Sequence, residues 1–145
     1  MATFVLAHEF KNYVGAKKID LSTGGGDTFK IGLTDSTPTA AGTQVLADLT
    51  MITTNGGAAK TVTHAWAETG AGTGIWRFSI GADQTWTAVT GAIPQFSYAV
   101  LYDDTPSGTP TKPIVGWWAT GTQNIAENST FTLNVDADFA VFELN

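Results

Sequence analysis

The sequence contains no cysteine among its 145 residues. Disulfides, thiol nucleophiles and cysteine-ligated zinc sites are therefore excluded, while the redox compartment stays open. Charged residues make up only 14% of the chain, against about 25% in typical soluble domains. Threonine, serine, asparagine and glycine supply the polarity instead, which is common in β-proteins whose faces pack against neighbours.

Basic residues and long apolar runs are also scarce. The formal net charge is −6, so we expect nucleic-acid phosphate and anionic lipid to repel the chain as a whole. Lys11, Lys17 and Lys18 form the main basic patch. No apolar run reaches the length of about eighteen residues that spans a membrane. The start, MATFVLAHEF, lacks the basic region and cleavage site of a secretion signal. We therefore expect neither nucleic acid nor a membrane as partner, and a product that stays in the cytosol or assembles there.

Short apolar segments at hairpin spacing fill most of the chain, and clusters of Gly, Asn, Asp, Ser and Thr separate them. The predicted strands are Thr28–Thr34, Lys60–Glu68, Ile75–Ile80, Trp86–Ile93, Phe96–Tyr102, Pro113–Trp118, Thr130–Val135 and Phe139–Leu144. Pro94 is expected to end the fourth of these, and the segment Gly121–Asn124 is polar. The predicted turns include Ser22–Asp27, Asn55–Gly57, Thr69–Gly74 and Asp136–Asp138, and a brief helical turn is expected within Gln44–Ile52.

The first residues have a different pattern. Apolar side chains recur at the spacing of one helix face, at Leu6, Phe10, Tyr13 and Val14. Thr3 is the predicted N-cap and Gly15 the predicted end, while a strand over Thr3–Ala7 is the alternative. The whole pattern predicts a mainly β, antiparallel β-sandwich or jelly-roll-like single domain over residues 1–145. Residues 1–20 form an N-terminal segment with a short helix.

The most apolar part is a predicted hairpin, Phe96–Tyr102 and Pro113–Trp118, joined by the polar loop Asp103–Lys112. Adjacent Trp117 and Trp118 must point to opposite faces of a strand, so we expect at least one of them to leave the core as an interface anchor. The alternative is that the five tryptophans of the chain contribute to a sugar-binding platform.

No residue set predicts catalysis, a cofactor or a metal site. His8 and His64 are the only histidines, and His64 is expected to be packed or at an edge. The Ser22–Asp27 glycine run lacks the ending of a phosphate-binding loop. Asp103 and Asp104 have the chemistry of an acid–base pair or of calcium ligands, but their position at a strand end favours carboxylates that bond their own turn backbone.

Three segments resemble a family of small virion proteins of tailed bacteriophages, recognised as structural or head-decoration proteins. They are Phe29–Ile52 (FKIGLTDSTPTAAGTQVLADLTMI), Phe96–Trp118 (FSYAVLYDDTP…PIVGWW) and Asn128–Asp136 (NSTFTLNVD), in matching order and spacing. They cover somewhat over a third of the chain. Thr54-Asn55-Gly56-Gly57 stands where the family commonly has a G-N-G-Y element.

The resemblance implies a capsid decoration or cement protein, which binds the outer head lattice and stabilises it and which typically forms a homotrimer. It implies the major capsid protein as partner, the phage head surface as location and synthesis in the host cytoplasm. The alternatives are a receptor- or glycan-binding module of the tail or fibre and, more weakly, an enzyme such as a glycan hydrolase. The residues expected at the docking interface are Phe4, Phe10, Lys11, Tyr13, Lys17, Lys18, Trp117 and Trp118.

Overall fold

Strands make up most of the regular structure of this protein. The computed structural model describes residues 3–105, 110–135 and 141–145. In chain order the elements are β1 (Phe4–Leu6), α1 (His8–Gly15), β2 (Phe29–Thr34), the 3-10 helix η1 (Leu46–Asp48), β3 (Lys60–Thr61), β4 (His64–Glu68), β5 (Trp76–Ile80), β6 (Gln84–Thr87), β7 (Ile93–Asp103), β8 (Ile114–Ile125), β9 (Thr130–Leu133) and β10 (Phe142–Leu144). Within the described residues they form a five-stranded sheet in the order β1-β8-β7-β2-β3, a three-stranded sheet β10-β5-β4 and the pair β6-β9. The predicted fold class, a mainly antiparallel β domain with a short N-terminal helix, is confirmed.

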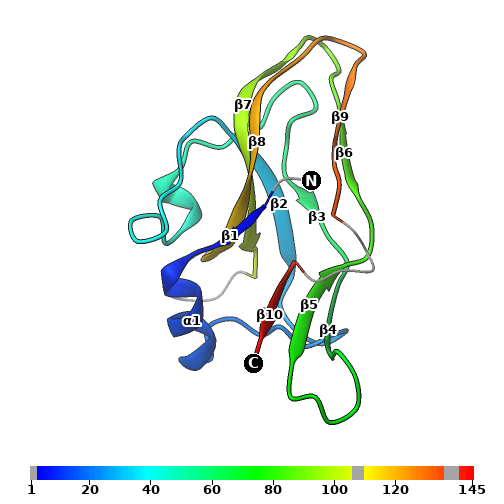
Figure 1. Cartoon of the computed structure of the whole chain (residues 1–145). Helices are drawn as coiled ribbons and strands as arrows, with labels where there is room; N and C mark the ends of the chain where they lie inside the picture. The colour runs from blue at the N-terminus through cyan, green and yellow to red at the C-terminus, as the bar shows by residue number, and fades with distance from the viewer. Residues whose placement is uncertain (1–2, 106–109, 136–140) are drawn as a thin grey trace.

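The pairing of β7 with β8 lies at the centre of the five-stranded sheet (Figure 1). Ala99 faces Trp118 and Val100 faces Trp117 across the pair, and all four residues are at most 5% exposed. Because adjacent residues point to opposite faces of a strand, their burial means that both faces of this pair are covered. Fully burying a side chain such as that of Val100 contributes about 1.5–3 kcal/mol, so this hairpin holds a large share of the core.

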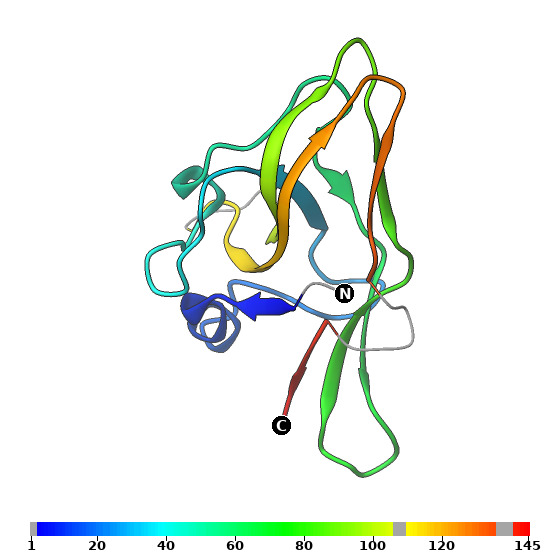
Figure 2. The ribbon, with the colours of Figure 1, turned by 45° about the horizontal axis from the view of Figure 1, so that its top comes forward.

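The chain passes from β6 into β7 and from β8 into β9 at the same end of the molecule (Figure 2). The N–H of Ala88 donates to the carbonyl of Ser129, and the N–H of Asn128 donates to that of Ala88, both at 2.9 Å. These hydrogen bonds join the β6–β7 connection to the β8–β9 connection. Trp86 of β6 is fully buried, and its indole N–H donates to the carbonyl of Ala58 at 3.0 Å. The β6-β9 pair therefore extends the core beyond the five-stranded sheet.

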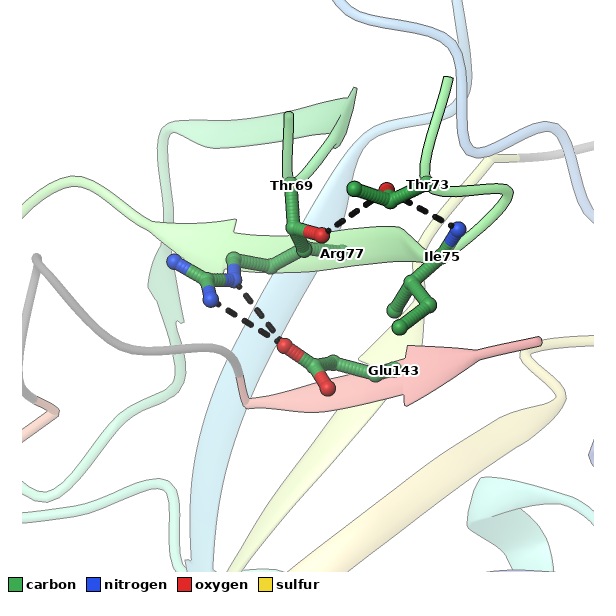
Figure 3. Close-up of polar contacts among 5 residues, drawn as sticks. All are labelled: Thr69, Thr73, Ile75, Arg77 and Glu143. Atoms are coloured by element: carbon green, nitrogen blue, oxygen red, sulfur yellow. Dashed lines mark hydrogen bonds and ion pairs between the residues drawn. The ribbon is translucent and has the colours of Figure 1, made fainter. Parts of the chain in front are cut away.

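The three-stranded sheet places β10 against β5 (Figure 3). On one face, the guanidinium of Arg77 binds one carboxylate oxygen of Glu143 through Nε at 3.2 Å and a terminal nitrogen at 3.1 Å. On the other face, the rings of Phe78 and Phe142 stack at 5.1 Å. The hydroxyl of Thr73 lies 3.2 Å from that of Thr69 and so closes the turn between β4 and β5. The last described residues are thus fixed to the body by both polar and apolar contacts.

The structure corrects several predicted boundaries. Pro94 does not end a strand but lies inside β7, next to a register shift near its start, where a residue without an N–H is tolerated. β8 continues through the polar segment Gly121–Asn124 to Ile125, because backbone pairing such as Phe96 with Gln123 does not depend on side-chain polarity. The strand predicted over Lys60–Glu68 is divided into β3 and β4.

Other predictions hold or cannot be compared. The helical turn expected within Gln44–Ile52 is η1, and the turns at Asn55–Gly57 and Thr69–Gly74 are present. The predicted turn Asp136–Asp138, the residue Phe139 and positions 106–109 of the Asp103–Lys112 loop lie outside the described residues. In the part of the chain that the structure describes, no helix has the length and apolar character needed to cross a membrane.

The N-terminal segment contains both structures that the sequence suggested for it, a strand followed by a helix. β1 pairs with β8, and α1 then starts at His8 with Ala7 in the N-cap position. Thr3 is therefore wrong as the cap, while Gly15 ends the helix as predicted. Apolar residues at Phe4 and Leu6 belong to the strand, and only the later ones belong to the helix face.

We predict that Gly116→Ala separates β1 from β8. A Cβ at Gly116 would collide with the carbonyl oxygen of Val5 and the ring of Phe4. Overpacking of this kind costs about 1–3 kcal/mol, and urea unfolding would measure it. Gly15→Ala is the matched control, because a Cβ there meets nothing within 4 Å and lies in a helix. Equal free energies of unfolding for the two variants would contradict the prediction.

Candidate functional site

The N-terminal segment, which the structure describes from residue 3 onward, is bound to the β body rather than extending from it as a free arm. Phe4 pairs with Trp118 and Leu6 with Gly116, and the N–H of Ala7 donates to the carbonyl of Val115 at 3.0 Å. The N–H of His8 then donates to the carbonyl of Ala40 at 2.9 Å. The segment is therefore attached to the central sheet and to the loop around Ala40.

The predicted interface residues divide into three groups. Lys11, Lys17 and Lys18 are exposed, whereas Phe4 and Tyr13 are partly buried. The third group consists of Phe10, Trp117 and Trp118, which are all buried.

The buried group requires a correction, because none of its three side chains is available to a partner on the surface of this chain. Phe10 packs edge-on against Phe142, with ring centroids 5.0 Å apart. Trp118 lies against the ring of Phe4 at 4.7 Å. The expectation that Trp117 or Trp118 leaves the core is wrong, because both faces of β8 are covered at this point. Among the described residues, the large apolar side chains that are exposed are those of Val5, Trp76 and Val89.

Two hollows flank α1. The first, which we name the Tyr13 groove, measures ≈ 640 Å³ and lies between α1 and the segment around η1. Tyr13, Leu46, Leu49 and Met51 are among its apolar lining residues, and Lys112 lies at the same groove. Burial, with smaller contributions from Glu9 and Asp48, raises the pKa of Tyr13, so its phenol stays neutral.

The second hollow, the Trp66 groove, measures ≈ 390 Å³ and lies at the carboxyl end of α1. Val14, Ile19, Leu21 and Trp66 line it together with Lys17, Asp20 and Ser22. Residues of the N-terminal segment thus contribute to both grooves, and Lys17 lies beside the apolar residues of the Trp66 groove. No sequence pattern indicated either groove, because their other walls come from distant segments.

A cluster of carboxylates lies where β7 ends. The N–H of Thr105 donates to the carboxylate of Asp103 at 2.8 Å, which confirms the predicted bond to the turn backbone. Asp104 binds Lys30 at 2.7 Å and Lys112 at 3.1 Å. Burial alone would raise the pKa of Asp104, but the hydrogen bonds from the two lysines outweigh it and lower that pKa.

Asp103 also contacts Asp27, a residue that the sequence placed only in a turn. Asp103 is 2% exposed. Burial, followed by this contact with Asp27, raises the pKa of Asp103 to about 7. No local signal indicates this pair, because its members are far apart in the sequence.

His64 is packed against aromatic rings, and potential metal ligands do not cluster in the described residues. His64 stacks on Phe78 at 5.3 Å and meets the ring of Phe29 edge-on at 4.8 Å, which confirms the expected packed histidine. Its Nε2 lies 3.3 Å from the carbonyl oxygen of Ser22. Within residues 3–105, 110–135 and 141–145, His, Asp and Glu do not gather in groups of three or more that could hold a metal ion.

Comparison with known proteins finds no relative of this chain. No protein-family model, no curated protein and no solved structure matches the chain. Its function therefore has to be argued from its own residues.

We predict that the free energy of unfolding decreases as the pH rises from about 4 to about 7. Asp103 has a raised pKa, so between its unfolded value near 3.8 and its folded value of about 7 the native state binds more protons than the unfolded state. Rising pH therefore destabilises the native state in this window, by about 1 kcal/mol or more. Asp20, Asp48 and Asp104 have lowered pKa values and lose their contribution only below pH 3.8, outside this window.

Urea unfolding of wild type and Asp103→Asn at pH 4.5, 6 and 8 measures this effect. The Asn amide keeps a donor for Asp27 without a titrating proton, so we expect a much smaller decrease in the variant. An equal decrease in both proteins would contradict the assignment to Asp103.

Proposed function

We propose that this chain is a bacteriophage virion structural protein, a capsid decoration or cement protein that binds the outer head lattice and stabilises it. The resemblance of its three sequence segments to small virion proteins supports the proposal. The structural observation that carries it is the N-terminal segment, which is hydrogen-bonded to the central sheet and presents three exposed lysines, of which Lys17 lines the Trp66 groove.

A cement protein has to transmit load between neighbouring capsid subunits. A free arm would lose conformational entropy when it docks, whereas a segment already paired with β8 loses little. Lys11, Lys17 and Lys18 provide positive charge on a protein of net charge −6, which favours an acidic surface on the major capsid protein. The Trp66 groove, which Lys17 lines, supplies apolar area for the same contact.

We predict that replacing Lys11, Lys17 and Lys18 together by Glu weakens binding to expanded heads by at least about tenfold, because the charges at the contact are reversed. Co-sedimentation of purified protein with heads that lack it measures this binding. Replacing the same lysines by Arg keeps the charge and is the matched control. Undiminished binding of the Glu variant would contradict the proposed docking surface.

Surface substitutions are better suited to this test than deletion of residues 2–18. The deletion would remove β1 and the fully buried Phe10, so lost binding would not distinguish docking from misfolding. The proposal includes self-association as a homotrimer, which light scattering after size exclusion measures. It assigns no reaction to Asp103 and Asp104.

A second candidate function is a receptor- or glycan-binding module of the tail or fibre, which one observation favours. Trp76 is 42% exposed, and its ring stacks on Trp66 at 5.8 Å with an interplanar angle of 24°. Trp66 also lines the groove that holds Asp20 and Ser22, so an aromatic face and hydrogen-bonding groups lie close together. Sites for small polar ligands combine these two features.

If this second function holds, Trp76→Ala abolishes binding on a glycan array, while Trp76→Phe retains part of it because a ring remains for stacking. Val89→Ala removes another exposed apolar side chain, 49% exposed, and serves as the control. If the wild-type protein binds heads but no glycan, the second candidate function is contradicted and the decoration function is retained.

A further inference from the structure

The Tyr13 groove is the hollow beside α1 that the proposed docking surface does not use. Its volume of ≈ 640 Å³ lies within the range of about 300–1,000 Å³ that is typical of ligand sites. One wall comes from α1, and the others come from residues 44–51 and 110–112. The N–H of Leu46 donates to the carbonyl of Lys112 at 2.9 Å and so joins the last two walls to each other. The groove is therefore formed before anything binds in it.

The lining of the groove is largely apolar and can adapt in part. Leu46 and Leu49 contribute to it from the segment around η1. Met51 is fixed at its backbone, because it pairs with Thr34 of β2. A Cβ at Gly32 would meet the terminal methyl group of Met51, so this side chain lies over the glycine. Because the thioether of methionine is unbranched and adapts to neighbours of different shape, the groove is suited to an apolar side chain of a partner.

Two hydrogen-bonding side chains of the groove have no partner among the described residues. They are the hydroxyl of Tyr13 and the amide of Gln44. The backbone of Gln44 is fixed, because its N–H donates to the carboxylate of Asp48 at 2.8 Å and its carbonyl accepts the N–H of Ile114 at 2.9 Å. A neutral phenol and a carboxamide each offer a donor and an acceptor. They therefore match the N–H and C=O groups of a peptide backbone.

Two carboxylates add negative charge beside Tyr13. Glu9 precedes Tyr13 by about one turn of α1, so the two side chains lie on the same face of the helix. The carboxylate of Asp48 in η1 accepts the N–H groups of Gln44 and Val45 at 2.8 and 3.0 Å. Burial is the largest cause of the raised pKa of Tyr13, and both carboxylates add to it. The potential at this part of the groove is therefore negative.

Lysines near the groove offset this charge only in part. Lys112 lines the groove, but its ammonium binds the carboxylate of Asp104 at 3.1 Å. Asp104 also binds Lys30 at 2.7 Å, so Lys112 keeps some positive charge. Lys11 is two positions from Tyr13 and therefore faces a different side of the helix. Two carboxylates against one shared lysine favour a basic partner over an acidic one.

We propose that the Tyr13 groove binds a protein segment in which an apolar side chain lies next to a lysine or arginine. The apolar side chain enters the groove, and the basic side chain meets the carboxylates of Glu9 and Asp48. The backbone of the segment exchanges hydrogen bonds with the hydroxyl of Tyr13 and the amide of Gln44. The proposal does not depend on the decoration function, because the three exposed lysines of that function are not among the described residues that line this groove.

Three tripeptides with blocked ends, Lys-Phe-Lys, Gln-Phe-Gln and Glu-Phe-Glu, test the groove because they carry the same ring between different charges. In an NMR titration of isotope-labelled protein they should shift the backbone amides of Gln44, Ala47 and Leu49, which line the groove. We expect the Kd of Lys-Phe-Lys to be at least about tenfold lower than that of Glu-Phe-Glu, with Gln-Phe-Gln between them. Phenethylamine has the ring and a positive charge without a peptide backbone, so it should bind more weakly than Lys-Phe-Lys.

Variants that remove the charge locate this preference at the two carboxylates. Glu9→Gln keeps an acceptor for the amide of Asn12, which the carboxylate of Glu9 accepts at 3.0 Å. Asp48→Asn likewise keeps an acceptor for the backbone N–H groups that Asp48 binds. In the double variant we expect the Kd values of the three tripeptides to agree within about twofold. Glu127→Gln removes an exposed carboxylate in the β8–β9 turn and is the matched control, which should bind as wild type does.

Several results would overturn the proposal. They are an absence of shifts in the groove, a Glu-Phe-Glu peptide that binds as tightly as Lys-Phe-Lys, and a double variant that keeps the preference of the wild type. Equal affinity for phenethylamine would indicate a small-molecule site instead. Shifts of the same amides with protein concentration alone would assign the groove to a second copy of this chain. Glu9→Gln alone should reduce the preference, so the test remains decisive if Asp48→Asn does not fold.

Discussion

The pairing of β7 with β8 is the constraint on which the other elements depend. These are the two longest strands, and the five-stranded sheet is built outward from them, with β1 added to β8 and β2 added to β7. Register shifts between Ile93 and Phe96, and between Phe96 and Tyr98, mark irregular pairing near the start of β7. Irregularities of this kind bend a strand. Because β6 precedes β7 and β9 follows β8, the bent end of this hairpin also positions the β6-β9 pair.

The same hairpin determines how rigid the candidate docking surface is. The backbone of Val115 and Gly116 receives the N-terminal segment, and Gly116 leaves the space that the ring of Phe4 occupies. Lys11 follows directly on the buried Phe10, so the helix that carries it is fixed by the core, and Lys17 and Lys18 come just after the end of that helix. A surface fixed in this way binds with little loss of conformational entropy.

Much of the fold could be predicted from alternation and turn residues. The pattern of Phe29, Ile31 and Leu33 located β2 almost to the residue, because a strand with one apolar face has an unambiguous period of two. The same reasoning failed where tertiary packing decides whether a side chain is buried or exposed. The exposed anchor expected at Trp117 or Trp118 assumed one solvated face, and the sequence contains no signal that a second layer covers it.

The candidate sites were less accessible to sequence reasoning, because contacts between distant segments create them. The turn chemistry of Asp103 was predictable from its neighbours, but its contact with Asp27 depends on the register that brings Phe29 opposite Asp103 in the β2–β7 pair. That register also places Asp104 beside Lys30, with which it forms an ion pair, while the buried Asp103 accepts the N–H of Thr105. The arrangement of the central strands therefore sets the burial that raises the pKa of this carboxyl.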